Sequence, residues 1–133
     1  MTISVIIPVL NEAAILENTL QRVTSLGGDY EVIVVDGGST DNTAAIAGHY
    51  ATVLSGTKGR AVQMNLGAKE AGGDILLFLH ADTILPDGAF GAIEKALANP
   101  AITGGRFKVQ LDEAGWRTHR ASDVWDAMIN SRK

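Results

Sequence analysis

Short apolar stretches alternate along the chain with stretches whose apolar residues recur every three or four positions, and this alternation predicts strands that alternate with helices. The predicted strands span residues 3–9, 30–35, 51–54, 75–79 and 101–111, and the predicted helices span residues 13–26, 42–50, 60–71 and 86–98. Strands and helices that alternate at these lengths form right-handed βαβ units. We therefore expect an α/β fold, a three-layer sandwich in which helices cover both faces of a mostly parallel central sheet.

Turn and capping residues mark the ends of these predicted elements. Asn11 is placed to cap the first helix, and Gly27 with Gly28 is placed to end it. Residues 75–79 are the most apolar stretch of the chain, which favours a strand buried on both faces. In the third predicted helix one face collects the small or apolar residues, which are Ala61, Met64, Ala68 and Ala71.

The chain beyond residue 112 carries one more amphipathic stripe, formed by Ala121, Val124, Trp125 and Met128. This spacing predicts a helix that ends close to the last residue. We therefore expect a domain over residues 1–111 followed by a C-terminal helical tail over residues 112–133. The tail either folds back onto the domain, joins two copies of the chain as a homo-oligomer, or contacts a segment outside this sequence.

Composition excludes several classes of protein. With 133 residues, 46% hydrophobic and 20% charged, the chain resembles a globular domain rather than a disordered segment. Acidic residues outnumber basic ones 15 to 11, which argues against a partner that is a nucleic acid. The lack of cysteine excludes a disulfide framework, a thiolate zinc site and a cysteine nucleophile.

The sequence also bears on location in the cell. No apolar run approaches the roughly 20 residues that a membrane-spanning helix needs. The N-terminus lacks the basic stretch of a signal peptide. We therefore expect a cytoplasmic protein without a transmembrane segment, and peripheral association with a membrane stays open.

Polar residues follow three of the predicted strands at the point where each strand ends. Asn11 and Glu12 follow the first strand, residues 36–41 follow the second, and His80 and Asp82 follow the fourth. Each group alone is explained as a helix cap or a tight turn. Because the carboxyl ends of parallel strands meet at one edge, where open α/β sheets bind ligands, the three groups together predict a site there.

The turn after the second strand is suited to an anionic group. Gly37, Gly38 and Ser39 precede a predicted helix and would let backbone amides approach a phosphate or a ribose. The chain contains neither GxGxxG nor GxxxxGK[ST], which weighs against a Rossmann dinucleotide site and a P-loop.

Carboxylates at this edge point to a metal. Asp36 and Asp82 would repel a diphosphate unless a divalent cation lay between them, and carboxylate oxygens suit Mg²⁺ or Mn²⁺. Lys58 and Arg60 either add positive charge at this edge or belong to the ordinary solvated surface. The residues therefore predict a site for a metal-bridged nucleotide.

Four motifs in order resemble the family 2 glycosyltransferases of the GT-A fold. Residues 4–12, SVIIPVLNE, resemble the first strand and loop of that family, and residues 32–43, VIVVDGGSTDNT, resemble its nucleotide-binding turn, usually written VVDDGSTDxT. Residues 58–61, KGRA, with Asn65 and Gly67, and then residues 73–82, GDILLFLHAD, are similar to the stretch that leads into the metal motif. The resemblance covers about the first 110 residues.

The resemblance implies a transferase that binds a nucleotide-diphospho-sugar, typically a UDP-sugar, with Mn²⁺ or Mg²⁺ and passes the sugar with inversion to an acceptor hydroxyl of unknown identity. Asp36 would accept a hydrogen bond from the base. Asp82 matches the last Asp of the DxD metal motif, and the full nucleotide-binding set is Pro8, Asn11, Glu12, Asp36, Gly38, Ser39, Lys58, Arg60, Asn65 and Ala81.

The chain departs from the family pattern at two positions. His80 stands where the family usually has Asp, so it is a metal ligand, a contact to the acceptor or a core histidine. Gly37 replaces a common Asp, which removes one contact to the nucleotide.

Members of the family continue for about another hundred residues, which supply the acceptor site and the catalytic base. No carboxylate in this chain matches that base, so the catalytic residues stay unknown and the chain is expected to be a truncated form or a nucleotide-binding half that needs a partner. A non-catalytic nucleotide-sugar-binding module is the alternative function. A nucleotidyltransferase would need a basic, glycine-rich loop after the first strand, and a receiver-type domain would need an acidic pair there; residues 8–12, PVLNE, provide neither.

Overall fold

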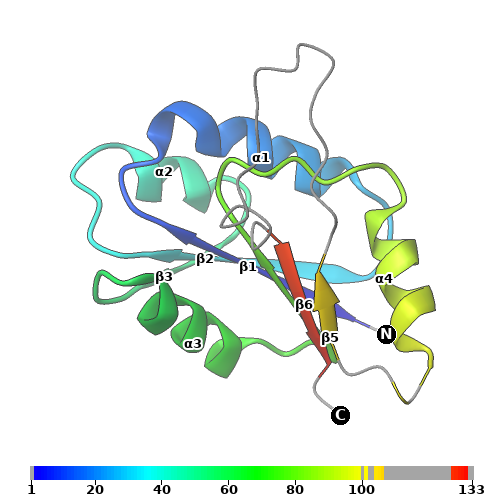
Figure 1. Cartoon of the computed structure of the whole chain (residues 1–133). Coiled ribbons are helices and arrows are strands. Elements are labelled where there is room, and N and C mark those ends of the chain that lie inside the picture. Colours follow the sequence, from blue (N-terminus) through cyan, green and yellow to red (C-terminus); the bar gives the residue numbers. More distant parts are fainter. Residues whose placement is uncertain (1, 100, 102–103, 107–126, 132–133) are drawn as a thin grey trace, which may run out of the picture.

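A computed structural model describes residues 2–99, 101, 104–106 and 127–131. Its central sheet has the strand order β3-β2-β1-β4-β6-β5 (Figure 1). The strands are β1 (Ile3–Val9), β2 (Tyr30–Asp36), β3 (Thr52–Ser55), β4 (Ile75–Leu79), β5 (Gly104–Arg106) and β6 (Ala127–Ser131). The strands β1 to β4 run parallel, and β6 is antiparallel to both of its neighbours. The predicted α/β fold with a mostly parallel sheet is confirmed.

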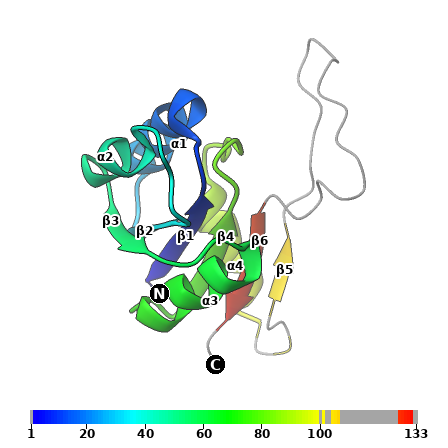
Figure 2. The same cartoon turned by 90° about the vertical axis from the view of Figure 1, so that its left-hand side faces the viewer.

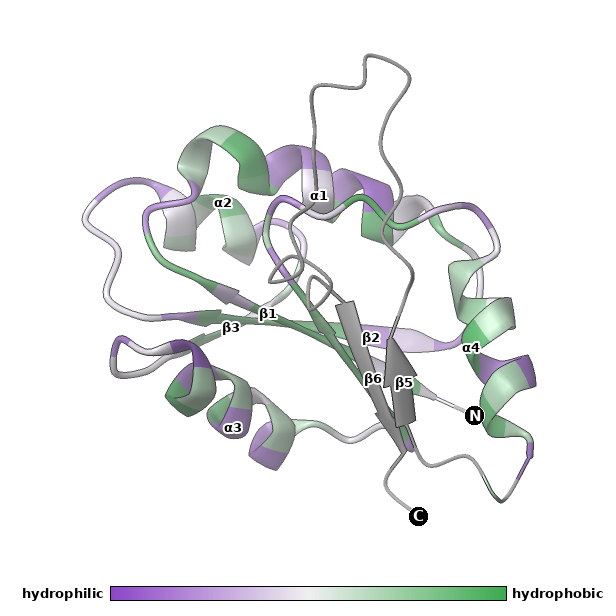
Figure 3. Ribbon diagram, in the orientation of Figure 1, coloured by the Kyte–Doolittle hydropathy of each residue, from purple (hydrophilic) through white to green (hydrophobic). Residues whose placement is uncertain are grey.

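Helices pack on both faces of this sheet. They are α1 (Ala13–Ser25), α2 (Thr43–Gly48), α3 (Arg60–Glu70) and α4 (Ala89–Leu97). One apolar cluster joins α1, α2 and α4 to the first face, whereas a second cluster places α3 against the other face, and Figure 2 shows α3 on the opposite side of the sheet from α1 and α2. Figure 3 shows hydrophobic residues concentrated along the central strands. The three layers follow from strands whose alternate side chains enter the two clusters.

Met64, Ala68 and Ala71 pack in the second apolar cluster as predicted, although the most buried positions of α3 differ from the predicted ones. Gln63 and Gly67 are its buried residues, and Ala61 is exposed. A Cβ atom at Gly67 would lie 2.5 Å from Cγ2 of Ile6 and 3.1 Å from Cγ2 of Val35. The helix therefore approaches the sheet through the one residue that has no side chain, and this close approach sets which face is buried.

The predicted C-terminal helix is wrong at its end, because Ala127–Ser131 forms β6. This strand pairs with β4, with Leu79 opposite Ala127 and Ile75 opposite Ser131. As an edge strand the fully buried β4 would leave a row of backbone N–H and C=O groups unpaired, and β6 supplies their partners. Helical spacing is a local signal and does not contain this long-range pairing.

The domain boundary predicted at residue 111 falls between β5 and β6, which belong to the same sheet. Ala127–Ser131 belongs to the sheet and not to a separate tail, so a contact between copies through a helix at these residues is not supported. Of the predicted strand over residues 101–111, Gly104–Arg106 is β5. Residues 107–126, with the remainder of the predicted helix, lie outside the described residues. Within the described ranges no helix has the length and apolar character to cross a membrane.

Candidate functional site

A pocket of about 200 Å³ opens where β1 and β4 end and α3 begins. The loop after β1, the first turn of α3 and the segment after β4 contribute its walls. The lining residues are Pro8, Val9, Leu10, Glu12, Arg60, Gln63, His80, Ala81 and Asp82. The pocket thus lies at the carboxyl edge of the parallel strands, where open α/β sheets bind ligands.

The predicted site residues divide into two groups. Those that line the pocket are Pro8, Glu12, Arg60, His80, Ala81 and Asp82. Those outside the lining are Asn11, Asp36, Gly38, Ser39, Lys58 and Asn65. Lys58 and Asn65 are exposed, whereas Asp36 is 7% exposed at the end of β2. Residues that follow β1 and β4 therefore lie together in the pocket, whereas those that follow β2 lie outside its lining.

Negative charges meet at the pocket. Burial raises the pKa of Glu12 above its ordinary value, and the charges of Asp82 and Asp41 raise it further. The carboxylate of Asp82 is exposed and lines the same pocket as Glu12. Repulsion between these carboxylates would fall if a cation bound among them.

Arg60 provides the positive charge of the pocket. Its Nη2 atom lies 3.1 Å from Nδ1 of His80. A guanidinium only donates hydrogen bonds, so Nδ1 of His80 accepts this one. In that arrangement His80 is a neutral imidazole whose proton is on Nε2. The contact joins the first turn of α3 to the segment that follows β4.

Gln63 is a pocket residue that neither motif nor periodicity reveals. Its side chain is buried, and Nε2 donates to the carbonyl oxygens of Val9 and Val35, each at 2.9 Å. Its Oε1 accepts from the backbone N–H of Gly59 at 3.1 Å. Gln63 thus joins the ends of β1 and β2 to the start of α3.

The same residue explains a departure from the family pattern. A Cβ atom at Gly37 would lie 2.8 Å from Oε1 of Gln63, closer than real Cβ contacts come. The space that an aspartate side chain would need at position 37 is therefore taken by the Gln63 amide.

Asn11 does not cap α1 as predicted. Its backbone adopts a φ of 52°, and its Oδ1 accepts from the backbone N–H of Thr40 at 2.8 Å. The backbone N–H of Asn11 donates to Oγ of Ser39 at 2.8 Å. These contacts tie the loop after β1 to the loop after β2. The Asn11 side chain is used in them and does not cap the helix.

The start of α1 receives its partners from the loop after β2. The backbone N–H of Glu12 donates to Oγ1 of Thr43 at 2.9 Å, and that of Ala13 donates to Oδ2 of Asp41 at 3.3 Å. The hydrogen bonds from the side chain and then the backbone of Thr43 lower the pKa of Asp41. Asp41 and Thr43 therefore act as a cap supplied from another loop.

Asp36 is bound within its own turn. Its carboxylate accepts from the backbone N–H of Ser39 at 3.2 and 3.3 Å and from the hydroxyl of the same residue. A carboxylate can accept about four hydrogen bonds, so the turn leaves acceptor capacity on Asp36.

The donor set of the pocket suits a metal that is shared with a ligand. Among the described residues no group of three or more His, Asp or Glu side chains is arranged to hold a metal ion. Mg²⁺ in nucleotide sites is commonly held by one or two carboxylates together with phosphate oxygens and water. Asp82 and Glu12, which repel each other in one pocket, fit that smaller role.

Comparison with known proteins identifies the family of the chain. A family model described as Glycosyl transferase family 2 matches residues 4–133. A poly-beta-1,6-N-acetyl-D-glucosamine synthase of Staphylococcus epidermidis is 34% identical over 114 residues, which cover 77% of this chain and 28% of that protein. A PGL/p-HBAD biosynthesis glycosyltransferase of Mycobacterium bovis is 42% identical over 91 residues, which cover 62% of this chain and 36% of that protein.

Solved structures share the fold. The mannosyltransferase PcManGT of Pyrobaculum calidifontis, in complex with GDP-Man and Mn²⁺, has a TM-score of 0.78 at 22% identity over 98% of this chain and 44% of that chain. Glucosyl-3-phosphoglycerate synthase of Mycobacterium tuberculosis, in complex with Mn²⁺, UDP and glucosyl-3-phosphoglycerate, has a TM-score of 0.71 at 25% identity over 98% and 57% of the two chains. The expected GT-A fold is confirmed. The chain spans about a third of the length of the curated relatives it matches. On the match over residues 4–133, the chain belongs to Glycosyl transferase family 2.

Proposed function

We propose that the chain binds a nucleotide-diphospho-sugar together with a divalent cation and forms the donor-binding part of a glycosyltransferase. In the whole protein the sugar would pass to an acceptor hydroxyl with inversion. The observation that carries the proposal is the meeting of Glu12, Asp82 and Arg60 in one pocket, because a metal diphosphate presents both a cation and anionic oxygens. The nucleotides and Mn²⁺ named with the two solved transferases support it.

Asp82, with Glu12 beside it, would hold the cation, and the diphosphate would complete its ligands. When bound, a divalent cation neutralises charge that develops on the leaving diphosphate. Arg60 would face the diphosphate oxygens that the cation does not contact. His80 accepts a hydrogen bond from Arg60 at Nδ1 and carries its proton on Nε2, so neither nitrogen offers a lone pair to a metal in that state. This favours an orienting role for His80 over metal ligation.

The nucleoside would lie toward the loop after β2. Asn11, Ser39 and Thr40 fasten this loop to the loop after β1, which lines the pocket. Asp36 would use its remaining acceptor capacity for an N–H group of the base, which uracil and guanine both present. Gly38 has a φ of 101° and no atom within 4 Å of its Cβ position, so backbone can come close to a ribose there.

The proposal is tested by thermal unfolding of the chain with UDP, GDP, CMP or ADP, each with Mn²⁺ or with a chelator. A ligand at a hundred times its Kd adds about 2.7 kcal/mol, which raises Tm by about 5–15 °C for a domain of this size. We expect a shift that needs Mn²⁺ and is largest for one nucleotide. If no nucleotide shifts Tm with Mn²⁺ present, the proposal is wrong.

A further inference from the structure

Asp82 lies on an irregular segment between β4 and α4, and this segment has to be held in place for its carboxylate to face the pocket. Residues 80–88 contain neither helix nor strand. Within the segment the backbone N–H of Thr83 donates to the carbonyl of His80 at 3.1 Å. The hydroxyl of Thr83 is buried and has no hydrogen-bond partner among the described residues. The side chain next to Asp82 therefore does not fix the segment by a hydrogen bond of its own.

Helix α1 is a fixed support beside this segment. Leu16, Leu20 and Val23 are fully buried in the larger apolar cluster, so the helix cannot shift without disturbing the core. Thr19 and Arg22 are three residues apart and therefore lie on neighbouring positions of one helix face. Both reach the backbone of the segment that carries Asp82.

Thr19 makes the first tie, directly before Asp82. Its side chain is 1% exposed, and its hydroxyl donates to the carbonyl oxygen of Ala81. The same hydroxyl lies 3.5 Å from the carbonyl of Ile15, which is the weaker of its two contacts. The peptide bond between Ala81 and Asp82 is thereby fixed from α1.

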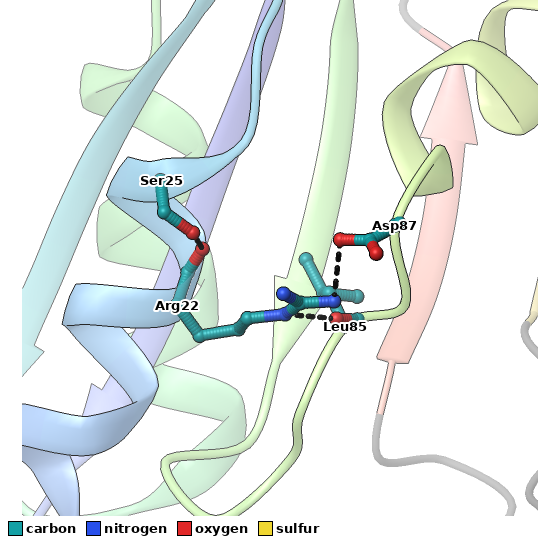
Figure 4. A network of polar contacts seen from close by, with 4 residues as sticks. All are labelled: Arg22, Ser25, Leu85 and Asp87. Carbon is teal, nitrogen blue, oxygen red and sulfur yellow. Dashed lines mark hydrogen bonds and ion pairs between the residues drawn. The ribbon is translucent and has the colours of Figure 1, made fainter.

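Arg22 makes the second tie, three residues after Asp82 (Figure 4). Its Nε donates to the carbonyl oxygen of Leu85 at 2.8 Å, and its Nη2 forms an ion pair with Oδ1 of Asp87 at 2.9 Å. The side chain of Asp87 is 89% exposed, so water screens this ion pair. The bond to the Leu85 carbonyl is part-buried and is the stronger of the two contacts.

We propose that Thr19 and Arg22 are positioning residues that hold the backbone on both sides of Asp82, so that its carboxylate meets the divalent cation in the pocket. This inference rests on the proposed function. Two side chains of α1 that do not line the pocket would thereby set the affinity for the metal. Outer-shell groups that orient a metal ligand commonly change metal affinity by about 10- to 100-fold when they are removed.

The experiment measures UDP and GDP binding by calorimetry, with Mn²⁺ titrated from zero and with a chelator as reference. Thr19→Val and Arg22→Met remove the two ties and keep most of the side-chain volume. Each is expected to raise the Mn²⁺ concentration for half-maximal binding about tenfold. Nucleotide affinity measured with the chelator is expected to stay unchanged, which a general loss of folding would not produce.

Three matched variants serve as controls. Thr19→Ser keeps the hydroxyl donor, Asp87→Ala removes only the exposed ion pair, and Thr83→Val removes a hydroxyl without a partner in the described part of the chain. All three are expected to keep the Mn²⁺ dependence of the unaltered chain. Their Tm values show whether any change in metal affinity merely follows stability.

The outcomes separate the two proposals. A wild-type chain that binds neither nucleotide in a Mn²⁺-dependent way would overturn the proposed function and this inference with it. If the wild-type chain binds a nucleotide in a Mn²⁺-dependent way, and Thr19→Val and Arg22→Met keep the same Mn²⁺ dependence, this inference alone is overturned. A loss in Thr19→Ser equal to that in Thr19→Val would also contradict it, because the hydroxyl would then not matter.

Discussion

The loop after β2 and the segment after β4 both bring carboxylates to the same edge of the sheet, yet they use them differently. In the first loop Asp36 accepts hydrogen bonds from Ser39, and Asp41 accepts them from Thr43 and Ala13. In the second, Asp82 lines the pocket, and the backbone on either side of it is held by α1. The carboxylates of the first loop mainly hold that loop in shape, whereas the second segment presents a carboxylate to the pocket.

Glu12 lies between the two. Its backbone N–H donates to Thr43, the first residue of α2 directly after the first loop, while its carboxylate lines the pocket with Asp82. Burial raises the pKa of Glu12 most, and the negative charges of Asp82 and Asp41, one on each side, raise it further. A pKa raised by burial and by like charges, as at Glu12, marks the side that faces the pocket, whereas a pKa lowered by hydrogen bonds, as at Asp41, marks a structural carboxylate.

The largest expected effect concerns the amide that joins both strand ends. Gln63→Leu removes the amide donor of the Val9 and Val35 carbonyls and the acceptor of the Gly59 N–H, and the Val9 carbonyl keeps only the N–H of Gly37 among these contacts. Buried groups that lose a hydrogen bond cost about 1–3 kcal/mol each, so we expect a loss of about 3 kcal/mol in the free energy of unfolding, measured in urea. The control Met64→Leu, on the same helix, should cost under about 1.5 kcal/mol. Equal stability of the two variants would show that Gln63 does not fasten the edge.

Substitution of Asp36 tests whether the loop after β2 also contacts the base of the nucleotide. Asp36→Ala should weaken UDP or GDP about tenfold and leave pyrophosphate unchanged, because a lost hydrogen bond to the base is worth about 1.4 kcal/mol. The measurement is calorimetry with Mn²⁺ present. Equal losses for nucleotide and pyrophosphate would remove Asp36 from the base side and make the loop wholly structural.

A smaller effect is expected where the first loop caps α1. Thr43 is fully buried, accepts from the N–H of Glu12 and donates to Asp41. Thr43→Val should cost about 1 kcal/mol and lower Tm by about 4 °C. Its Mn²⁺-dependent nucleotide binding should not change. A fall in metal affinity at unchanged Tm would mean that the two loops do not divide their roles in this way.

The smallest effect is a pH dependence of opposite sign at Glu12 and Asp41. The folded-state pKa of Glu12 is raised, so its charged form opposes folding, and stability gained by protonation appears as pH falls through that pKa toward 4.5. Glu12→Gln should therefore raise Tm at pH 7, by about 1 °C because solvent screens a part-exposed group.

The pKa of Asp41 is lowered, so its contribution is present above 3.8 and is lost as pH falls through the lowered value. Asp41→Asn should lower Tm at pH 7 and converge with the unaltered chain in acid. Tm measured from pH 3 to pH 8 checks both signs, and parallel curves for the two variants would contradict them.

Much of this fold could be predicted from sequence because its elements follow one another locally. The bounds of β1 and β4 coincide with the predicted ranges, since each is an apolar run between polar residues. The strand Ala127–Ser131 could not be predicted, because its pairing with β4 joins residues about fifty positions apart. The contacts of Asn11 escape sequence prediction for a related reason, because its partners, Ser39 and Thr40, lie on another loop.

The pocket lining could be predicted where strand ends carry unusual residues, as at Glu12 and Asp82. Gln63 was not, because a glutamine in a helix is ordinarily exposed and only the close approach at Gly67 turns its face inward. Thr19 and Arg22 give no sequence signal for the same reason: their function depends on which segment passes the helix.

The most direct measurement compares Mn²⁺-dependent binding of UDP and GDP in the unaltered chain, Asp82→Asn and Thr43→Val, with Tm recorded for each. We expect Asp82→Asn to lose at least about tenfold in Mn²⁺-dependent affinity while its Tm stays within about 2 °C, and Thr43→Val to show the reverse. Undiminished Mn²⁺-dependent binding in Asp82→Asn would contradict the division of roles between the two loops and the metal site with it.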